Sequence, residues 1–152
     1  MPREPEPLLG TSNFRVLIGR REHGFSEITR LTSETDLALP AEERRPTFET
    51  VVLRRALSRS TELYEWRRRI VGGTDDRRPV TIQQLDAPAG AVVNSWRLER
   101  AWPCRWSGPA FNAVESGIAY EEVELAFDDL VWDAPSAPPT PPSRSRTPTR
   151  GG

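Results

Sequence analysis

The sequence predicts a mainly β protein, an antiparallel β-barrel or sandwich of two packed sheets with one flanking α-helix. Short segments of alternating or β-branched apolar residues recur along the chain, while a single segment has helical spacing. Short turns rich in proline and glycine separate neighbouring segments, which favours antiparallel pairing. The chain has 152 residues, enough for one domain with its own core.

The first half contains strand patterns separated by a charged loop. Residues 13–18, NFRVLI, predict a strand whose alternate apolar side chains share one face: Phe14, Val16 and Ile18. Residues 24–39 carry a weaker extended pattern. The segment 40–46, PAEERRP, is charged and bounded by prolines, which indicates a loop. The β-branched segment 47–57, TFETVVLRRAL, predicts the next strand.

One helix is expected near residues 60–71, within SRSTELYEWRRRIVGG. Ser58 or Ser60 is a suitable N-cap. Three side chains at i, i+3 and i+7 form one apolar stripe that predicts packing against the sheets: Leu63, Trp66 and Ile70. The glycines at 72–73 favour a left-handed C-terminal residue.

The second half predicts a hairpin. Residues 78–86 place Val80 and Ile82 on one face, and the turn 87–90, APAG, leads into a strand over 91–102. The second strand has three apolar residues on one side: Val92, Trp96 and Leu98.

A last strand is expected over 117–130, GIAYEEVELAFDDL. Its apolar parity slips after Ile118 and Tyr120, which predicts a β-bulge near residues 121–122.

The segment WRLERAWPCRWSGP, residues 96–109, carries three tryptophans around the only cysteine. Three interpretations are open: a platform on which a sugar or base stacks, a redox or metal site at Cys104, or a packed corner of a β-fold. Since proline cannot donate to a strand ladder, we expect the strand to bend there with indoles filling the corner. The packing residues of this corner are Trp96, Trp102, Pro103 and Trp106.

The composition gives little indication of catalysis, metal binding, or binding to nucleic acid or membranes. A formal net charge of −1 gives no argument for nucleic-acid or membrane binding, and all 21 basic residues are arginine. One cysteine and one histidine exclude an internal disulfide and a Cys/His zinc site. We expect a buried structural Cys104, a solvated His23 in a turn, and an exposed strand face for the acidic runs EEVE and FDD. No catalytic residue, cofactor or metal is expected.

Three regions are expected from composition. We expect a flexible N-terminal arm at residues 1–12 and the β domain at residues 13–132. Residues 133–152 are expected to form a disordered tail rich in proline, serine and arginine. No apolar run approaches the length of a membrane span, and the N-terminus lacks the apolar core of a secretory signal.

Three blocks carry a resemblance to a known family: NFRVLI to HGFSEITRLTSETD, then TFETVVLRRALSRSTELYEW, then WRLERAWPCRWSGPAFNAVESGIAYEEVELAFDDL. In this order, over about residues 13–131, they resemble the tail tube proteins of contractile phages and of phage-like contractile injection systems.

The resemblance implies a structural, non-enzymatic role. It implies a barrel-like pair of sheets, hexameric rings that stack into a hollow tube, and sheath, baseplate and spike proteins as partners. Cargo in the lumen, assembly in the cytoplasm and incorporation into a phage tail or phage-like particle are further implications. From the sequence itself, no membrane anchor and no specific nucleic-acid binding are expected.

One departure concerns the segment 36–50, DLALPAEERRPTFET, which has no glycine where the family has a longer glycine-rich loop. The family uses this loop between subunits, so the candidate contact residues are Leu37, Leu39, Pro40, Arg44, Arg45 and Phe48. The shorter loop raises an alternative, a tube-initiating paralogue at the baseplate. A different class, a small-ligand-binding β-barrel using the tryptophans, also stays open.

Overall fold

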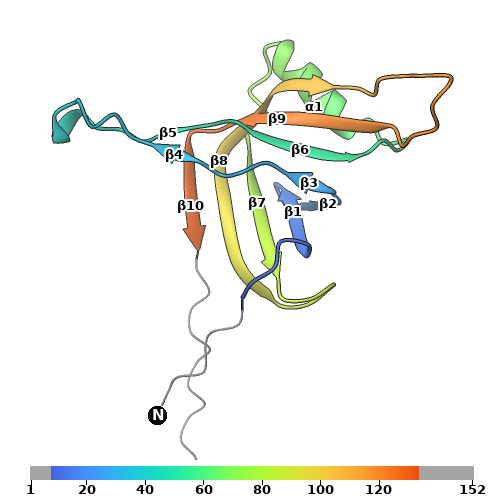
Figure 1. Cartoon of the computed structure of the whole chain (residues 1–152). Coiled ribbons are helices and arrows are strands. Elements are labelled where there is room, and N and C mark those ends of the chain that lie inside the picture. Colours follow the sequence, from blue (N-terminus) through green and yellow to red (C-terminus); the bar gives the residue numbers. More distant parts are fainter. Residues whose placement is uncertain (1–7, 134–152) are drawn as a thin grey trace, which may run out of the picture.

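The computed structural model describes residues 8–133 (Figure 1). The flexible N-terminus expected at 1–12 and the tail expected at 133–152 lie largely outside these residues and stay predictions. Within the described part of the chain, no helix is long and apolar enough to cross a membrane.

Two antiparallel sheets share one long strand, β8 (Val92–Ser107). The first sheet has the order β2-β1-β7-β8-β10, and the second has the order β8-β9-β6-β3. The bounds of the first sheet's other strands are Arg21–His23, Phe14–Ile18, Arg78–Leu85 and Asp129–Asp133. The bounds of β9, β6 and β3 are Tyr120–Ala126, Val51–Ala56 and Glu27–Ile28. The predicted fold class is therefore confirmed.

A separate arm leaves the body between β3 and β6. It consists of β4 (Ser33–Glu34), a short 3₁₀ helix (Ala41–Glu43) and β5 (Thr47–Phe48), and it projects to the left in Figure 1. The segment 40–46, predicted as a loop, contains this short helix.

The strand β8 passes from one sheet to the other. It pairs with β7 up to Ala101 and with β9 from Trp102 onward. The β7 register shifts beside Arg100, whose φ of 53° lies in the left-handed region, so an extra residue turns the strand there.

The strand was expected to break or bend at Pro103. Its main turn lies earlier, although its pairing with β9 is irregular directly after Pro103. The strand stays continuous through Pro103, which lies opposite Leu125, while the turn from one sheet to the other occurs at Arg100. In this half β8 is the edge strand of the second sheet, where a missing N–H is tolerated. A second register shift follows at Cys104.

The core lies between the inner faces of the two sheets, and the helix α1 (Glu62–Val71) closes it. Buried side chains come from every layer: Val16, Ile18, Val80 and Leu98 from the first sheet, Val51, Leu53, Val123 and Leu125 from the second, and Leu63 and Trp66 from the helix. The Trp66 indole is fully buried and its Nε1 donates to the carbonyl of Asp76 at 2.7 Å. Ile70 is partly buried against this cluster.

The helix differs from its prediction at its start. Thr61 is the N-cap and makes no side-chain capping bond. The Ser58 hydroxyl accepts from the N–H of Ser60, and the Ser60 hydroxyl accepts from the N–H of Glu62. The proposed serine caps are therefore wrong. The end is as predicted, since Gly73 has a φ of 90°.

The segment predicted as one last strand forms two strands, β9 and β10. The prediction of a β-bulge near residues 121–122 is wrong. β9 pairs with β6 in unbroken register, and its inward residues are Glu121, Val123 and Leu125. The slip in apolar parity arises because a carboxylate occupies an inward position. The Glu121 side chain is 2% exposed, so the prediction of an exposed acidic face is also wrong there.

Two donors satisfy the buried Glu121 carboxylate. Arg55 Nε, directly across from it on β6, lies 2.6 Å from Oε1, and Trp106 Nε1 donates to Oε2 at 3.0 Å. A buried, hydrogen-bonded ion pair becomes strongly destabilising when one partner is removed.

Replacing Glu121→Ala should therefore lower the free energy of unfolding by about 3–5 kcal/mol, because the Arg55 guanidinium stays buried without its carboxylate. Urea unfolding followed by tryptophan fluorescence measures this loss. The matched control is Glu122→Ala on the outer face, where the pair with Arg54 is exposed and worth about 0–1 kcal/mol. Equal losses in the two variants would contradict this role of Glu121.

Candidate functional site

The three tryptophans of residues 96–109 do not gather in one corner. Trp96 stacks on Trp132 with ring centroids 5.9 Å apart, whereas Trp106 meets Tyr64 edge-on at 5.1 Å. Trp102 lies beside Ile70 and Gly73 at the end of the helix. The two register shifts in β8 change which of its side chains point inward. The inward positions after Trp96 therefore do not follow the strict every-second-residue pattern of a regular strand. A joint stacking platform is therefore absent from this segment.

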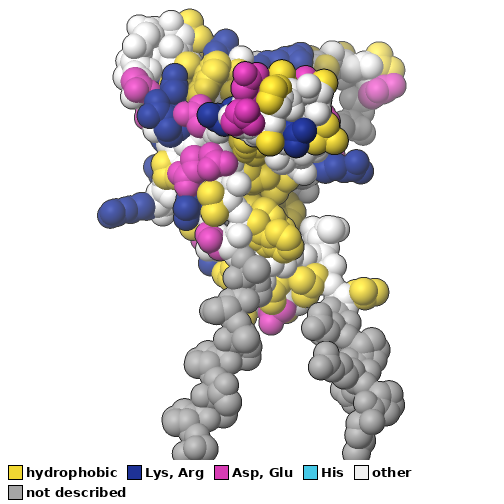
Figure 2. Space-filling view, turned by 90° about the vertical axis from the view of Figure 1, so that its left-hand side faces the viewer, with side chains coloured by type: hydrophobic (Ala, Val, Ile, Leu, Met, Phe, Trp, Pro, Cys, Tyr) yellow, Lys and Arg dark blue, Asp and Glu magenta, His cyan; other side chains and the backbone are white. Residues whose placement is uncertain are grey.

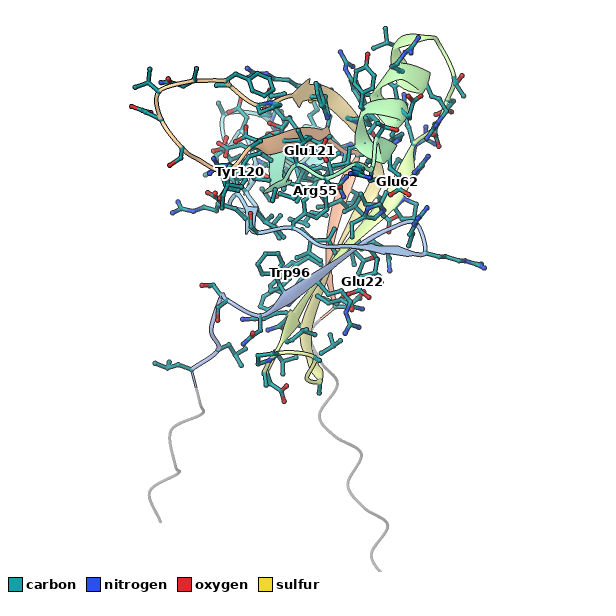
Figure 3. The ribbon with its side chains drawn as sticks, turned by 90° about the vertical axis from the view of Figure 1, so that its right-hand side faces the viewer. Glu22, Arg55, Glu62, Trp96, Tyr120 and Glu121 are labelled. Carbon is teal, nitrogen blue, oxygen red and sulfur yellow. The ribbon has the colours of Figure 1, made fainter. Side chains whose placement is uncertain are left out.

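A groove lies where the first sheet extends beyond the second. It has a volume of about 370 Å³, and its lining surface is mostly apolar although both polar and apolar residues contribute to it. The apolar lining is Phe14, Ile28, Leu31, Ile82 and Trp96. Figure 2 shows hydrophobic side chains in a column down the middle of one face, between charged groups. In Figure 3, Trp96 lies well below the layer that holds Arg55 and Glu121.

Cys104 has the environment of a structural thiol. It is half-buried, its Sγ lies 3.4 Å from the carbonyl of Glu124, and burial raises its pKa. A thiol with a raised pKa is a poor nucleophile at neutral pH.

His23 differs from its prediction as a solvated turn residue. It ends strand β2 with its side chain only 7% exposed, and its Nδ1 lies 3.6 Å from Glu62. Burial lowers the pKa of His23, with the positive charges of Arg55, Arg21 and Arg78 adding to this and Glu62 opposing it. Across residues 8–133, no group of His, Cys, Asp and Glu side chains is arranged to hold a metal ion.

Some of the exposed apolar side chains lie on two projecting segments, while others lie elsewhere, among them Leu8, Val71 and Trp132. The arm carries Leu37 and Leu39, and the loop 108–119 between β8 and β9 carries Phe111, Val114 and Ile118. Of the candidate contact residues on the arm, Pro40, Arg44 and Arg45 are also exposed, while Phe48 packs on Phe127 of its own chain with ring centroids 5.4 Å apart. Exposed apolar side chains on projecting segments are typical of surfaces that bind other proteins.

These features define a class of protein, a small mainly β domain in which two sheets share one strand and α1 closes the core. Residues 10–131 match the family model of the T4-like virus tail tube protein gp19, and the chain belongs to this family. The predicted resemblance to tail tube proteins is confirmed. No curated protein sequence matches the chain.

Solved structures share the fold at low sequence identity. The anti-feeding prophage cap, a tube-terminating cap, has a TM-score of 0.70 and 16% identity over 89% of this chain and 97% of that chain. The PVC sheath–tube complex of an extracellular contractile injection system has a TM-score of 0.66 and 20% identity over 85% and 93%. A chain of the anti-feeding prophage baseplate has a TM-score of 0.67 and 16% identity over 86% and 98%.

The lowered pKa of His23 predicts a pH dependence of stability. Since the folded pKa lies below the ordinary value of 6.5, protonation favours the unfolded chain. Stability is complete above that ordinary value and falls as the pH drops through the folded pKa. Urea midpoints measured between about pH 7.5 and pH 5.5 should fall for the wild type and fall less for His23→Gln. Identical pH profiles would show that His23 does not carry this effect.

Proposed function

We propose that the chain is a subunit of the inner tube of a contractile phage tail or phage-like injection system. In this proposal it forms hexameric rings, and the rings stack into a hollow tube inside a sheath. The family match over residues 10–131 is the observation that carries the proposal.

The sheet edges support a ring. β10 is an edge of the first sheet, and the second half of β8 is an edge of the second sheet. Open edges invite pairing with other chains, and a closed ring of identical subunits covers them without leaving free ends. Pairing around such a ring also extends the sheets into one continuous barrel.

The partners in this proposal are the sheath, baseplate and spike proteins, with cargo in the lumen. The similar folds in a sheath–tube complex and in a baseplate support the first two. The role is structural and non-enzymatic, with no cofactor. Assembly takes place in the cytoplasm, and the product becomes part of a phage-like particle.

The arm is the proposed inter-subunit loop, through Leu37, Leu39, Pro40, Arg44 and Arg45. All five residues are exposed, and the arm stands away from the body (Figure 1). The aromatic ring of Phe48 supports the base of the arm instead of reaching a neighbour.

A second candidate places the chain at one end of the tube, as a tube-initiating subunit at the baseplate. The segment 36–50 lacks glycine, and a chain of a baseplate shares the fold. A chain at the end of a tube needs one stacking surface fewer than a chain in the middle.

Negative-stain electron microscopy of the purified full chain separates these roles. The proposal predicts rings, and a main tube subunit should grow into long tubes as its concentration rises. Single rings that lengthen only when a baseplate is added would favour the initiating role. Dispersed monomers both alone and with sheath and baseplate proteins would contradict the proposal, and the Trp96 groove would then favour a ligand-binding domain.

A further inference from the structure

The groove at Trp96 is open and mostly apolar, and no segment within residues 8–133 fills it. Three neighbouring strands build its floor, since Phe14 lies on β1, Ile82 on β7 and Trp96 on β8. Ile28 and Leu31 line it from β3 and the residues that follow, on the side of the second sheet. Covering such a surface is favourable because it removes apolar area from water.

A chain of side-chain hydrogen bonds holds this floor in place. Trp132 Nε1 donates to Asn94 Oδ1 at 3.0 Å, and Asn94 Nδ2 donates to Gln84 Oε1 at 2.9 Å. Gln84 Nε2 in turn donates to the carbonyl of Gly10 at 2.7 Å. The Trp132 ring also stacks on the Trp96 ring. A preformed surface loses less conformational entropy when it binds a partner.

The ring N–H of Trp96 has no acceptor within the described part of the chain. The ring N–H groups of Trp66, Trp106 and Trp132 all donate to acceptors of the fold, so Trp96 differs from these three. A polyproline II helix suits such a surface, because it makes no internal hydrogen bonds and its carbonyls can accept from outside. Aromatic-lined grooves are a recurring site for proline-rich segments.

The chain carries a proline-rich segment of its own next to this groove. Residues 134–152, APSAPPTPPSRSRTPTRGG, lie outside the described residues and follow directly on β10. Pro135, Pro138 and Pro141 recur every three residues. Since a polyproline II helix has three residues per turn, it would place these three rings along one edge. The segment therefore offers an apolar edge to an apolar groove.

The starting point of this segment puts the groove within reach. Trp132 on β10 lies opposite Trp96, and Asp133 ends the strand one residue later. Neighbouring strands lie about 4.8 Å apart, so β7 and β1 are about 10 Å and about 14 Å from β10. The five steps from Asp133 to Pro138 span up to about 17 Å. Pro138 and the prolines after it can therefore lie over the groove of their own copy.

Charge favours this segment over the N-terminal one. Glu27 is the only charged side chain that lines the groove, and its pair with Arg54 is long, at 3.6 Å. Residues 134–152 carry three arginines and no acidic residue. Residues 1–7, MPREPEP, carry two glutamates and one arginine, and the next residue, Leu8, is 99% exposed. The C-terminal segment is therefore the better match in charge as well as in proline spacing.

We propose that residues 135–142 dock as a polyproline II helix in the Trp96 groove of the same copy. The proline rings pack on Trp96, Ile82 and Phe14, and a carbonyl of the segment accepts from the Trp96 ring N–H. The contact closes within one copy, so it does not depend on the proposed ring. It gives the C-terminal segment a role, which is to cover apolar surface that the fold leaves open.

Labelling of a cysteine in the groove tests this contact in the full chain. Thr11 lines the groove and is exposed, so Thr11→Cys in a Cys104→Ala background reports whether the groove is covered. Its reaction with a small maleimide should be about tenfold slower than in a four-serine variant of the same chain. A short tether gives an effective concentration in the millimolar range, so about tenfold protection needs a Kd of only about 0.1 mM. The four-serine variant carries Pro138→Ser, Pro139→Ser, Pro141→Ser and Pro142→Ser.

Two controls accompany this measurement. Pro148→Ser lies outside the three-residue spacing and should leave the slow rate unchanged. Val71→Cys, exposed at the end of the helix and outside the groove, should react at one rate with either tail. Equal rates for Thr11→Cys with and without the four prolines would overturn the contact. Protection that rises with protein concentration would also overturn it, because a second copy would then be the occupant.

The groove floor gives an independent prediction. Trp96→Leu in the Thr11→Cys chain should raise the labelling rate to about that of the four-serine variant, because it removes the aromatic ring and its N–H donor. The matched control is Trp102→Leu, which should keep the slow rate, since Trp102 lies beside the end of the helix and outside the groove. Urea unfolding of both variants checks that each is folded. A slow rate that persists in folded Trp96→Leu would contradict docking on this ring.

Discussion

The turn of β8 at Arg100 is the constraint on which the rest of the structure depends. One strand serves both sheets, so its extra residue sets the angle between them and creates the space that the core fills. Asp128 supports the turn from the start of the last hairpin strand: its carboxylate lies 2.9 Å from Arg100 Nε, and its N–H donates to the carbonyl of Glu99 at 2.9 Å. The paired charges lie on the outside, where water does not have to be removed.

A buried polar group near the end of β8 links three strands of the second sheet. Glu121 on β9 joins Arg55 on β6 to Trp106 on the second half of β8, so three neighbouring strands meet at one carboxylate (Figure 3). An apolar residue would fill the same volume, but it would not orient the indole or satisfy the arginine. The group therefore ties the end of β8 to β9 and β6 through Trp106 and Arg55.

Regular alternation made the first sheet and the helix predictable, since Val16, Ile18, Val80 and Ile82 point inward as their spacing indicates. The errors share one physical cause, which is long-range pairing. The inward position of Glu121 depends on Arg55, 66 residues away, and the burial of His23 depends on the helix that follows. The separation of the three indoles depends on register shifts that no local pattern shows. The exposed arm tip was found from family resemblance, whereas the apolar loop 108–119 could have been found from its lack of charge.

In the proposed function, copies of the chain complete the open sheet edges and contact the arm. Native mass spectrometry over a range of concentrations tests this claim most directly. The account predicts that monomers give way to a hexamer, or to multiples of a hexamer, with no dominant dimer, because a head-to-tail contact closes only in a ring. A protein that stays monomeric at every concentration, or that stops at a symmetric dimer, would contradict it.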